Sequence, residues 1–121
     1  MMFDDYCIKQ IISGKKTVTR RLRNDDNRPA VPGNIHKLKK DRTNRTYGYI
    51  KIMSCEKDVF GNLTTQDAKK EGFNSITEYE EYFLQVNGSV RKDLKIWVIE
   101  FEYLGKTMTL ILDMIHKVMN R

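Results

Sequence analysis

Residues 11–23 read IISGKKTVTRRLR and contain a hydrophobic run, a glycine and a β-branched run in succession. The hydrophobic run ends next to Gly14, and the β-branched run at 17–19 follows two lysines. Glycine reaches the positive φ that ends a helix or forms a tight turn, whereas β-branched residues favour strands. This stretch therefore predicts a helix, a glycine turn and a strand, with cationic side chains around the turn.

The positive charge of this stretch continues along the chain. Between residues 15 and 51 there are 12 lysines and arginines against 3 aspartates, a local charge of +9 in a chain whose net charge is +6. Positive charge concentrated in this way favours the binding of nucleic acid or another anion. A solvated basic surface hairpin would have the same composition, so both interpretations stay open.

The length and composition indicate one domain with one modest core. The chain has 121 residues, 40% hydrophobic and 31% charged, which is not the composition of a disordered segment. Cys7 and Cys55 lie far apart without a histidine cluster, so we expect no disulfide framework, no metal site and no cofactor. No apolar run has the length of a membrane helix, and the N-terminus lacks a signal-peptide core. We therefore expect a cytoplasmic protein that does not enter a membrane.

Hydrophobic periodicity and capping residues predict the remaining elements. The expected helices span 3–12, 64–71, 75–87 and 107–119, and the expected strands span 17–21, 35–38, 47–56 and 96–103. Candidate helix caps stand at the first three starts, namely Asp4 or Asp5, Thr64 or Thr65, and Ser75. No internal repeat is visible.

The helix expected over 107–119 is apolar around more than half of its circumference. A surface helix normally buries one stripe about 100° wide, so a second apolar face requires a partner. We expect a homodimer or a heterologous contact through this helix. The alternative is a helix sunk in a groove of its own chain, with Leu110 and Met114 fully buried.

Three segments in order resemble the ASCH domain family of small PUA-like β-barrels. The stretch that begins at Gly14 is similar to the signature G-x-K-x-x-T-x-R, and Pro32-Gly33-Asn34 stands where the family usually has P-G-D. The segment AKKEGFNS at 68–75 is similar to A-x-x-E-G-F-x-S. The resemblance implies an α+β fold, a closed barrel of about five or six strands with peripheral helices. It covers residues 1–104, and residues 105–121 are expected to form a C-terminal helical extension.

The resemblance also implies a site. Some proteins of similar layout are amidohydrolases that remove the acetyl group from N4-acetylcytidine with a lysine, a threonine and a glutamate, which correspond here to Lys16, Thr19 and Glu71. In such a site a base activates the threonine hydroxyl, and an acid protonates the departing amine. Other ASCH proteins are implicated in RNA binding or RNA cleavage, so this triad of residues leaves the activity open.

The spacing of the lysine and the threonine makes a geometric prediction. Lys16 and Thr19 are three residues apart, and an odd offset on a regular strand places side chains on opposite faces. We therefore expect Lys16 to belong to the turn after Gly14 and to share one cleft with Thr19 and Glu71.

Three functional hypotheses follow. The first is an RNA-associated protein that binds RNA, a nucleotide or a modified base in a basic cleft, with nucleic-acid contacts from Lys15, Arg20, Arg21, Arg23, Arg42 and Arg45. The second is an enzyme, either an N4-acetylcytidine-type amidohydrolase or a metal-independent ribonuclease. The third is a non-catalytic interaction module that uses the C-terminal helix.

Overall fold

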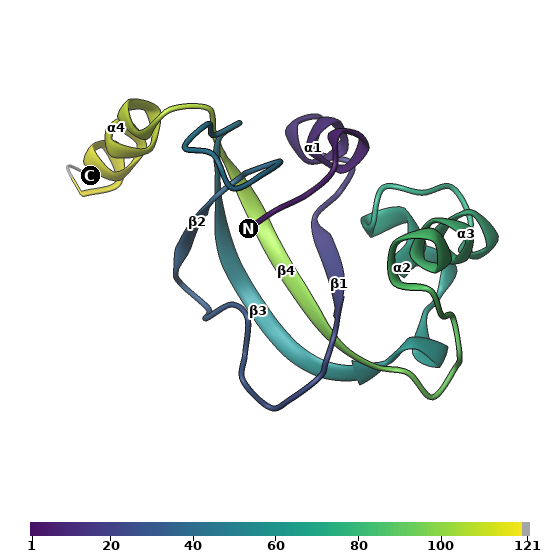
Figure 1. Cartoon of the computed structure of the whole chain (residues 1–121). Coiled ribbons are helices and arrows are strands. Elements are labelled where there is room, and N and C mark those ends of the chain that lie inside the picture. Colours follow the sequence, from purple (N-terminus) through teal and green to yellow (C-terminus); the bar gives the residue numbers. More distant parts are fainter. Residues whose placement is uncertain (120–121) are drawn as a thin grey trace.

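The computed structural model describes residues 1–119, except for the side chains of 108–111, 113 and 114. Four antiparallel strands form one sheet in the order β1-β4-β3-β2 (Figure 1). The strands are β1 (Val18–Leu22), β2 (Ile35–Lys37), β3 (Tyr49–Val59) and β4 (Lys95–Gly105). The helices are α1 (Asp5–Ile12), the short 3-10 helix η1 (Phe60–Asn62), α2 (Thr65–Lys70), α3 (Ile76–Asn87) and α4 (Met108–Met119).

The two long strands β3 and β4 form the centre of the molecule. Each has 11 residues, and their pairing shifts register between Ile52 and Ser54. Such irregularities increase the local twist, in line with the curvature of the pair in Figure 1. Alternate residues of both strands, including Ile50, Ile52, Ile99 and Phe101, are buried in the larger core cluster, which also contains residues of α1.

The expected helix, glycine turn and strand at the start of the chain are confirmed. Asp4 caps α1 by accepting a hydrogen bond from the backbone N–H of Cys7. Gly14 has a φ of 82°, and the backbone N–H groups of the two lysines that follow it both donate to the carbonyl of Gln10. The regular strand β1 begins only at Val18, so Lys16 lies in the turn segment, as expected.

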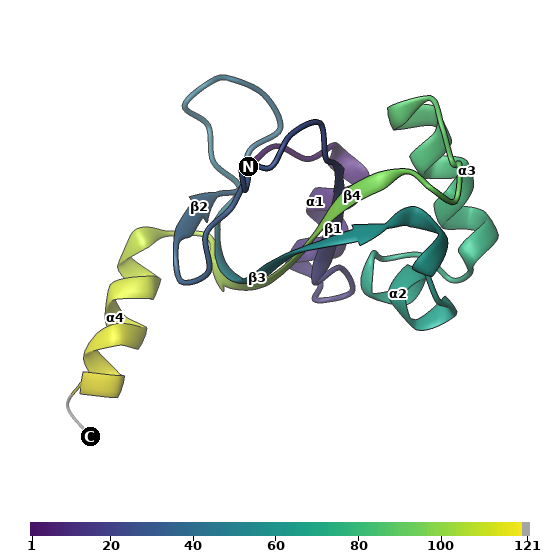
Figure 2. The ribbon, with the colours of Figure 1, turned by 90° about the horizontal axis from the view of Figure 1, so that it is seen from below.

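The helices α2 and α3 lie together beyond one end of the sheet (Figures 1 and 2). Thr64 and Asp67 form a complete capping box at the start of α2, and Ser75 caps α3. Gly72 separates the two helices with a φ of 93°. A second core cluster, which includes Phe60, Ala68, Tyr79, Phe83 and Ile96, holds these helices against the strand ends.

The expectation of a closed barrel with five or six strands is wrong for the described residues. The sheet has four strands and is open, because β1 and β2 form its two edges and do not pair with each other. The connection over 23–34 contains Pro29 and Pro32 and forms no strand, and the loop over 38–48 also leaves the sheet. Proline cannot donate a ladder hydrogen bond, which disfavours a further strand in the first of these segments.

The helix α4 projects from the end of the sheet opposite α2 and α3 (Figure 2). The alternative to a partner contact, in which Leu110 and Met114 are fully buried, falls outside the described side chains. Other apolar residues of α4 face solvent, with Leu112 58% and Val118 69% exposed. Within residues 1–119, no helix has the length and apolar character needed to cross a bilayer.

Candidate functional site

The turn after α1 brings Lys16 beside Glu71, the residue that ends α2. The two residues form an isolated antiparallel bridge, and both are almost fully buried. The ammonium group of Lys16 donates to Glu71 Oε1 at 2.5 Å and to the carbonyl oxygen of Val18 at 2.8 Å. A buried charge requires a close partner, so this ion pair fixes the positions of the Lys16 and Glu71 side chains.

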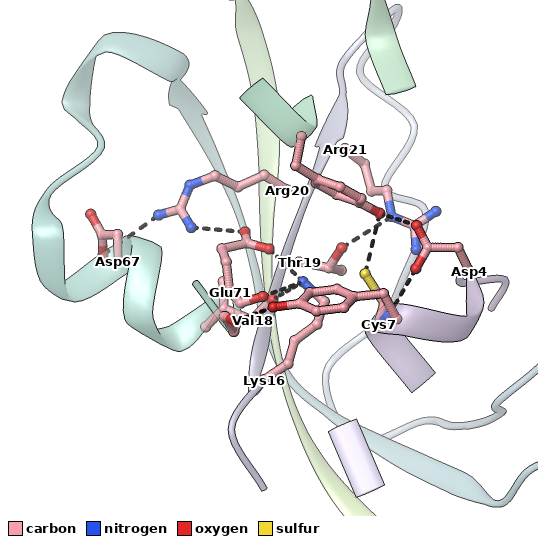
Figure 3. Close-up of polar contacts among 12 residues, drawn as sticks. Asp4, Cys7, Lys16, Val18, Thr19, Arg20, Arg21, Asp67 and Glu71 are labelled. Carbon is pink, nitrogen blue, oxygen red and sulfur yellow. Dashed lines mark hydrogen bonds and ion pairs between the residues drawn. The ribbon is translucent and has the colours of Figure 1, made fainter. Parts of the chain in front are cut away.

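A second cation binds the same carboxylate. Arg20 Nη1 donates to Glu71 Oε2 at 2.9 Å, and Arg20 Nη2 lies 3.5 Å from Asp67 Oδ1 (Figure 3). Glu71 therefore joins Lys16 and Arg20 in one buried cluster, which Asp67 extends toward solvent. The four side chains carry two positive and two negative formal charges, so the cluster is neutral as a whole.

Next to this cluster, Arg21 forms a hydrogen bond with the hydroxyl of Thr19. Arg21 Nε donates to Thr19 Oγ1 at 3.3 Å, and Arg21 Nη2 donates to the carbonyl of Met2 at 2.7 Å. The guanidinium lies 4.7 Å from the centre of the Phe3 ring, within the range of a cation–π contact. Burial lowers the pKa of Arg21 from its usual value.

A third group of polar side chains consists of Asp4, Tyr82 and Cys7. The Tyr82 hydroxyl donates to Asp4 Oδ2 at 2.5 Å and lies 3.2 Å from Cys7 Sγ. Asp4 and Cys7 are labelled in Figure 3. Burial, followed by the hydrogen bond to Asp4, raises the pKa of Tyr82, so this hydroxyl keeps its proton. Burial alone would raise the pKa of Asp4, but the hydrogen bonds from Tyr82 and from the Cys7 backbone outweigh it and leave that pKa below its usual value.

Except for Asp67, the side chains of these three groups line one cavity of about 480 Å³, a volume within the range of small-molecule sites. Lys16, Thr19 and Glu71 all contribute to its wall, so the three side chains share one cleft, as expected from the turn at Gly14. Their catalytic roles stay a prediction. Tyr79 and Tyr82 add aromatic surface to the same wall. Burial, followed by the charge of Glu71, raises the pKa of Tyr79.

The residues expected to contact nucleic acid occupy different environments. Arg20 and Arg21 line the cavity, whereas Lys15 is exposed. Arg23 lies over the ring of Trp97, 5.8 Å from its centre. The remaining two, Arg42 and Arg45, are exposed in the loop between β2 and β3.

Sequence reasoning missed part of the cavity wall. It used Asp4 only as a candidate helix cap and Cys7 only in the argument against a disulfide or a metal site, and it did not single out Tyr82. The contacts among them join residues that are 75 and 78 positions apart, and no local pattern indicates such contacts. Among the described residues, no group of three or more His, Cys, Asp or Glu side chains is placed to hold a metal ion.

The family model of the ASCH domain matches residues 1–105. The chain belongs to the ASCH domain family. The match ends where β4 ends, so α4 lies beyond it in this ASCH protein.

Solved structures confirm the fold. An ASCH domain from Lactobacillus crispatus is 17% identical with a TM-score of 0.68, and 85% of this chain and 76% of that chain are covered. A protein from Enterococcus faecalis is 14% identical with a TM-score of 0.64, with coverages of 88% and 80%. The ASCH protein from Zymomonas mobilis is 19% identical with a TM-score of 0.56, with coverages of 85% and 67%. No curated protein sequence matches this chain.

Proposed function

We propose that this ASCH protein binds a nucleoside, or a single unpaired nucleotide of an RNA, in the cavity beside Glu71. The observation that supports the proposal is the buried cluster of Lys16, Arg20 and Glu71, which lines a cavity of about 480 Å³. Charged groups held inside a partly enclosed pocket interact strongly with a polar ligand, because little water screens them.

The composition of the cavity wall suits a base. Tyr79, Tyr82 and Phe3 supply aromatic surface, while the charged and hydroxyl groups supply donors and acceptors. Proteins recognise RNA sequence mainly on unpaired bases, which stack on aromatic side chains and expose their hydrogen-bonding edges. The exposed cations Lys15, Arg42 and Arg45 would add contacts to neighbouring phosphates.

A titration of the ¹⁵N-labelled protein with cytidine, uridine, adenosine and guanosine, followed by NMR, tests the proposal. We expect saturable shift changes at residues that line the cavity. The variant Val86→Trp should abolish them, because Val86 is an exposed residue at the cavity wall. The matched control is Leu84→Trp, which adds the same ring to an exposed position of α3 outside the wall. Binding that persists in Val86→Trp, or no binding of any nucleoside, would overturn the proposal.

A second candidate function is hydrolysis of the amide of an acylated cytidine, as the resemblance to ASCH amidohydrolases implies. The favouring observation is that Thr19 Oγ1 accepts a hydrogen bond from Arg21 and lines the same cavity as Lys16 and Glu71. In this reaction Lys16 first passes a proton along its hydrogen bond to Glu71 Oε1. The resulting neutral amine takes the hydroxyl proton of Thr19, and Oγ1 attacks the carbonyl carbon. Glu71 protonates the departing amine, and water then cleaves the acyl-threonine ester.

Turnover of N4-acetylcytidine tests this second candidate. We expect Thr19→Ser to retain activity and Thr19→Val, which keeps the shape but loses the hydroxyl, to lower it by a factor of about 10² or more. Full activity in Thr19→Val would exclude Thr19 as the nucleophile. Cleavage of RNA by the same preparation without turnover of the acetylated nucleoside would favour the ribonuclease hypothesis instead.

The exposed apolar side chains of α4, which include Leu112, Ile115 and Val118, support a further part of the proposal. We propose that this helix forms a homodimer contact. A protein that dimerises but binds neither nucleosides nor RNA would be the non-catalytic interaction module of the third hypothesis.

A further inference from the structure

Outside the cavity, Arg23 has a guanidinium that the protein covers but does not bind by a hydrogen bond. The side chain is only 15% exposed. Among the described residues, its Nε is the one buried side-chain nitrogen or oxygen without a hydrogen-bond partner. Its Nη1 lies 4.0 Å from Asp26 Oδ1, which is too far for a hydrogen bond. Covered donors are normally satisfied, so this guanidinium has capacity for an acceptor from outside the chain.

A second cation, Lys57 on β3, lies beside Arg23. In the sheet, Trp97 on β4 is the partner of Lys57. The Arg23 guanidinium lies 5.8 Å and the Lys57 ammonium 6.0 Å from the centre of the indole ring. Trp97 is 3% exposed and belongs to the larger core cluster, so the ring is a rigid support for both cations. Two cations over one ring repel each other, and an anion between them relieves that repulsion.

Asp26 marks a position where an anion fits between these cations. Its Oδ1 accepts a hydrogen bond from Lys57 Nζ at 2.8 Å and is the same oxygen that lies 4.0 Å from Arg23 Nη1. The hydrogen bond from Lys57 lowers the pKa of Asp26, and the charges of Arg23 and Lys95 act in the same direction. The Asp26 side chain is 82% exposed, and ion pairs at such positions contribute little free energy. A phosphate that is tethered to a bound base can therefore take its place.

The two cations lie close to the cavity along β1. Thr19 and Arg21 line the cavity, and they share one face of β1 because they are two residues apart. Arg23 continues this row, since its backbone N–H still donates to the carbonyl of Lys95 on β4. At the rise of a β-strand, Arg21 and Arg23 are about 6–7 Å apart. A nucleotide spans such a distance between its base and its phosphate.

We propose that Arg23 and Lys57 form a phosphate subsite for the nucleotide whose base occupies the cavity. This inference rests on the proposed function and specifies its ligand class, a phosphorylated nucleotide rather than a free nucleoside. A phosphate oxygen replaces Asp26 Oδ1 and accepts hydrogen bonds from the ammonium and the guanidinium. Such charge-assisted hydrogen bonds are strong, and a guanidinium can donate two of them in parallel. The phosphate is either a diester of an RNA strand or the monoester of a free nucleotide, since both present the same oxygens.

Calorimetric titration with the four nucleosides, their 3′- and 5′-monophosphates and the dinucleotides ApA, CpC, GpG and UpU tests the inference. We expect the wild-type protein to bind phosphorylated ligands about tenfold or more tightly than the matching nucleosides. Arg23→Gln and Lys57→Gln should each remove most of this gain. Lys9→Gln, at an exposed position of α1, is the matched control and should keep it. A gain that extends to the dinucleotides identifies an RNA strand as the source of the phosphate, and a gain confined to the monophosphates identifies a free nucleotide.

Asp26→Asn provides a second test with the opposite sign. Loss of the competing charge should raise the affinity for the monophosphates about threefold or more relative to the nucleosides. Asp25→Asn should have a smaller effect, because Asp25 Oδ1 accepts from the backbone N–H of Asn27 rather than from a cation.

Two kinds of result would overturn the inference while leaving nucleoside binding in place. One is equal affinity of the wild-type protein for nucleosides and their phosphorylated forms. The other is an unchanged ratio of the two affinities in Arg23→Gln, Lys57→Gln or Asp26→Asn. No binding of any of these ligands would overturn the proposed function as well.

Discussion

At the scale of single residues, the site depends on one buried carboxylate. Glu71 is 1% exposed and binds two cations that come from the turn after α1 and from β1. An ion cluster of this kind contributes little net stability when it is complete, but the loss of one member leaves uncompensated charge in the interior. Because Glu71 lies at the end of α2, the positions of the Lys16 and Arg20 side chains depend on where that helix ends.

The first prediction concerns the removal of that carboxylate charge. Glu71→Gln should lower the free energy of unfolding by about 3–5 kcal/mol, because Lys16 and Arg20 would remain buried without a counter-charge. Urea unfolding followed by circular dichroism measures the change. Glu100→Gln, at an exposed position of β4, is the control and should change stability by less than about 0.5 kcal/mol. A loss below about 1 kcal/mol in Glu71→Gln would contradict the prediction.

The second prediction concerns the pH dependence that Asp4 contributes. Its folded-state pKa lies below the usual value of 3.8, since hydrogen bonds from Tyr82 and Cys7 outweigh the effect of burial. The stability that it contributes is therefore present above its unfolded pKa and is lost as the pH falls through the folded pKa. Melting temperatures should be higher for the wild-type protein than for Asp4→Asn at about pH 6, and the difference should vanish near about pH 2. A difference that is independent of pH would show that Asp4 stabilises the protein without its charge.

At the scale of elements, the junction between α2 and α3 positions the site. Gly72 follows Glu71 directly and has a φ of 93°, and a Cβ at this position would lie 3.2 Å from Gln10 Cβ. A glycine is required there both for the backbone angle and for the close approach of α1. The end of α2 is consequently held against the turn that contains Lys16.

The third prediction tests this close approach. Gly72→Ala should destabilise the protein by more than Gly88→Ala does, and it should weaken nucleoside binding. Both glycines have positive φ, but a Cβ at Gly88 meets no atom within 4 Å. The backbone strain costs about 1 kcal/mol or more in each variant, so the difference between them reports the contact with α1. Equal unfolding free energies for the two variants would contradict the prediction.

The fourth prediction concerns α4. The wild-type protein should sediment above its monomer mass of 14.3 kDa and approach twice that value as its concentration rises. Leu112→Glu with Val118→Glu should shift the mass to the monomer value, because the apolar contact would be lost. Lys117→Glu changes the charge at an exposed position of the same helix and serves as the control. A wild-type protein that stays monomeric at high micromolar concentration would exclude the homodimer.

At the scale of the whole molecule, four of the arginines expected to contact nucleic acid lie in two separate locations. Arg20 and Arg21 belong to the cavity, whereas Arg42 and Arg45 are exposed in the β2–β3 loop. Residues that look equivalent in the sequence therefore lie in different environments. Under the proposed function, the cations in the cavity would contact the base, and those in the loop would contact phosphates.

The fifth prediction follows from that division. Binding of single-stranded RNA should weaken with salt, and each of Arg42→Ala and Arg45→Ala should reduce the log–log salt slope by about 0.7, because each phosphate contact releases counterions. Fluorescence anisotropy at several salt concentrations measures the slope. Lys92→Ala, in the turn before β4, is the control and should leave the slope unchanged. Unchanged slopes in both arginine variants would remove this loop from the RNA interface.

Local chemistry was enough to predict most of the elements. The cap at Asp4, the turn at Gly14 and the β-branched run after it are local signals, and α1, the turn and β1 all appear where they predict them. Strand alternation likewise located the long central strands. The predicted number of strands was wrong because it was taken from the family resemblance. Closure of the sheet would require β1 to pair with β2, and such pairing depends on contacts between residues far apart in the chain.

The site, in contrast to the elements, depends mainly on contacts between residues that are far apart in the sequence. The turn argument predicted that Lys16 and Thr19 converge, and the motif match added Glu71 from 55 residues away. Nothing in the sequence indicated that Arg20 shares the same carboxylate, or that Tyr82 reaches Asp4 across 78 positions. Caps, turns and strand preferences arise within a few neighbouring residues, but the partner of a buried charge is chosen by how helices and strands pack, and only the folded chain contains that information.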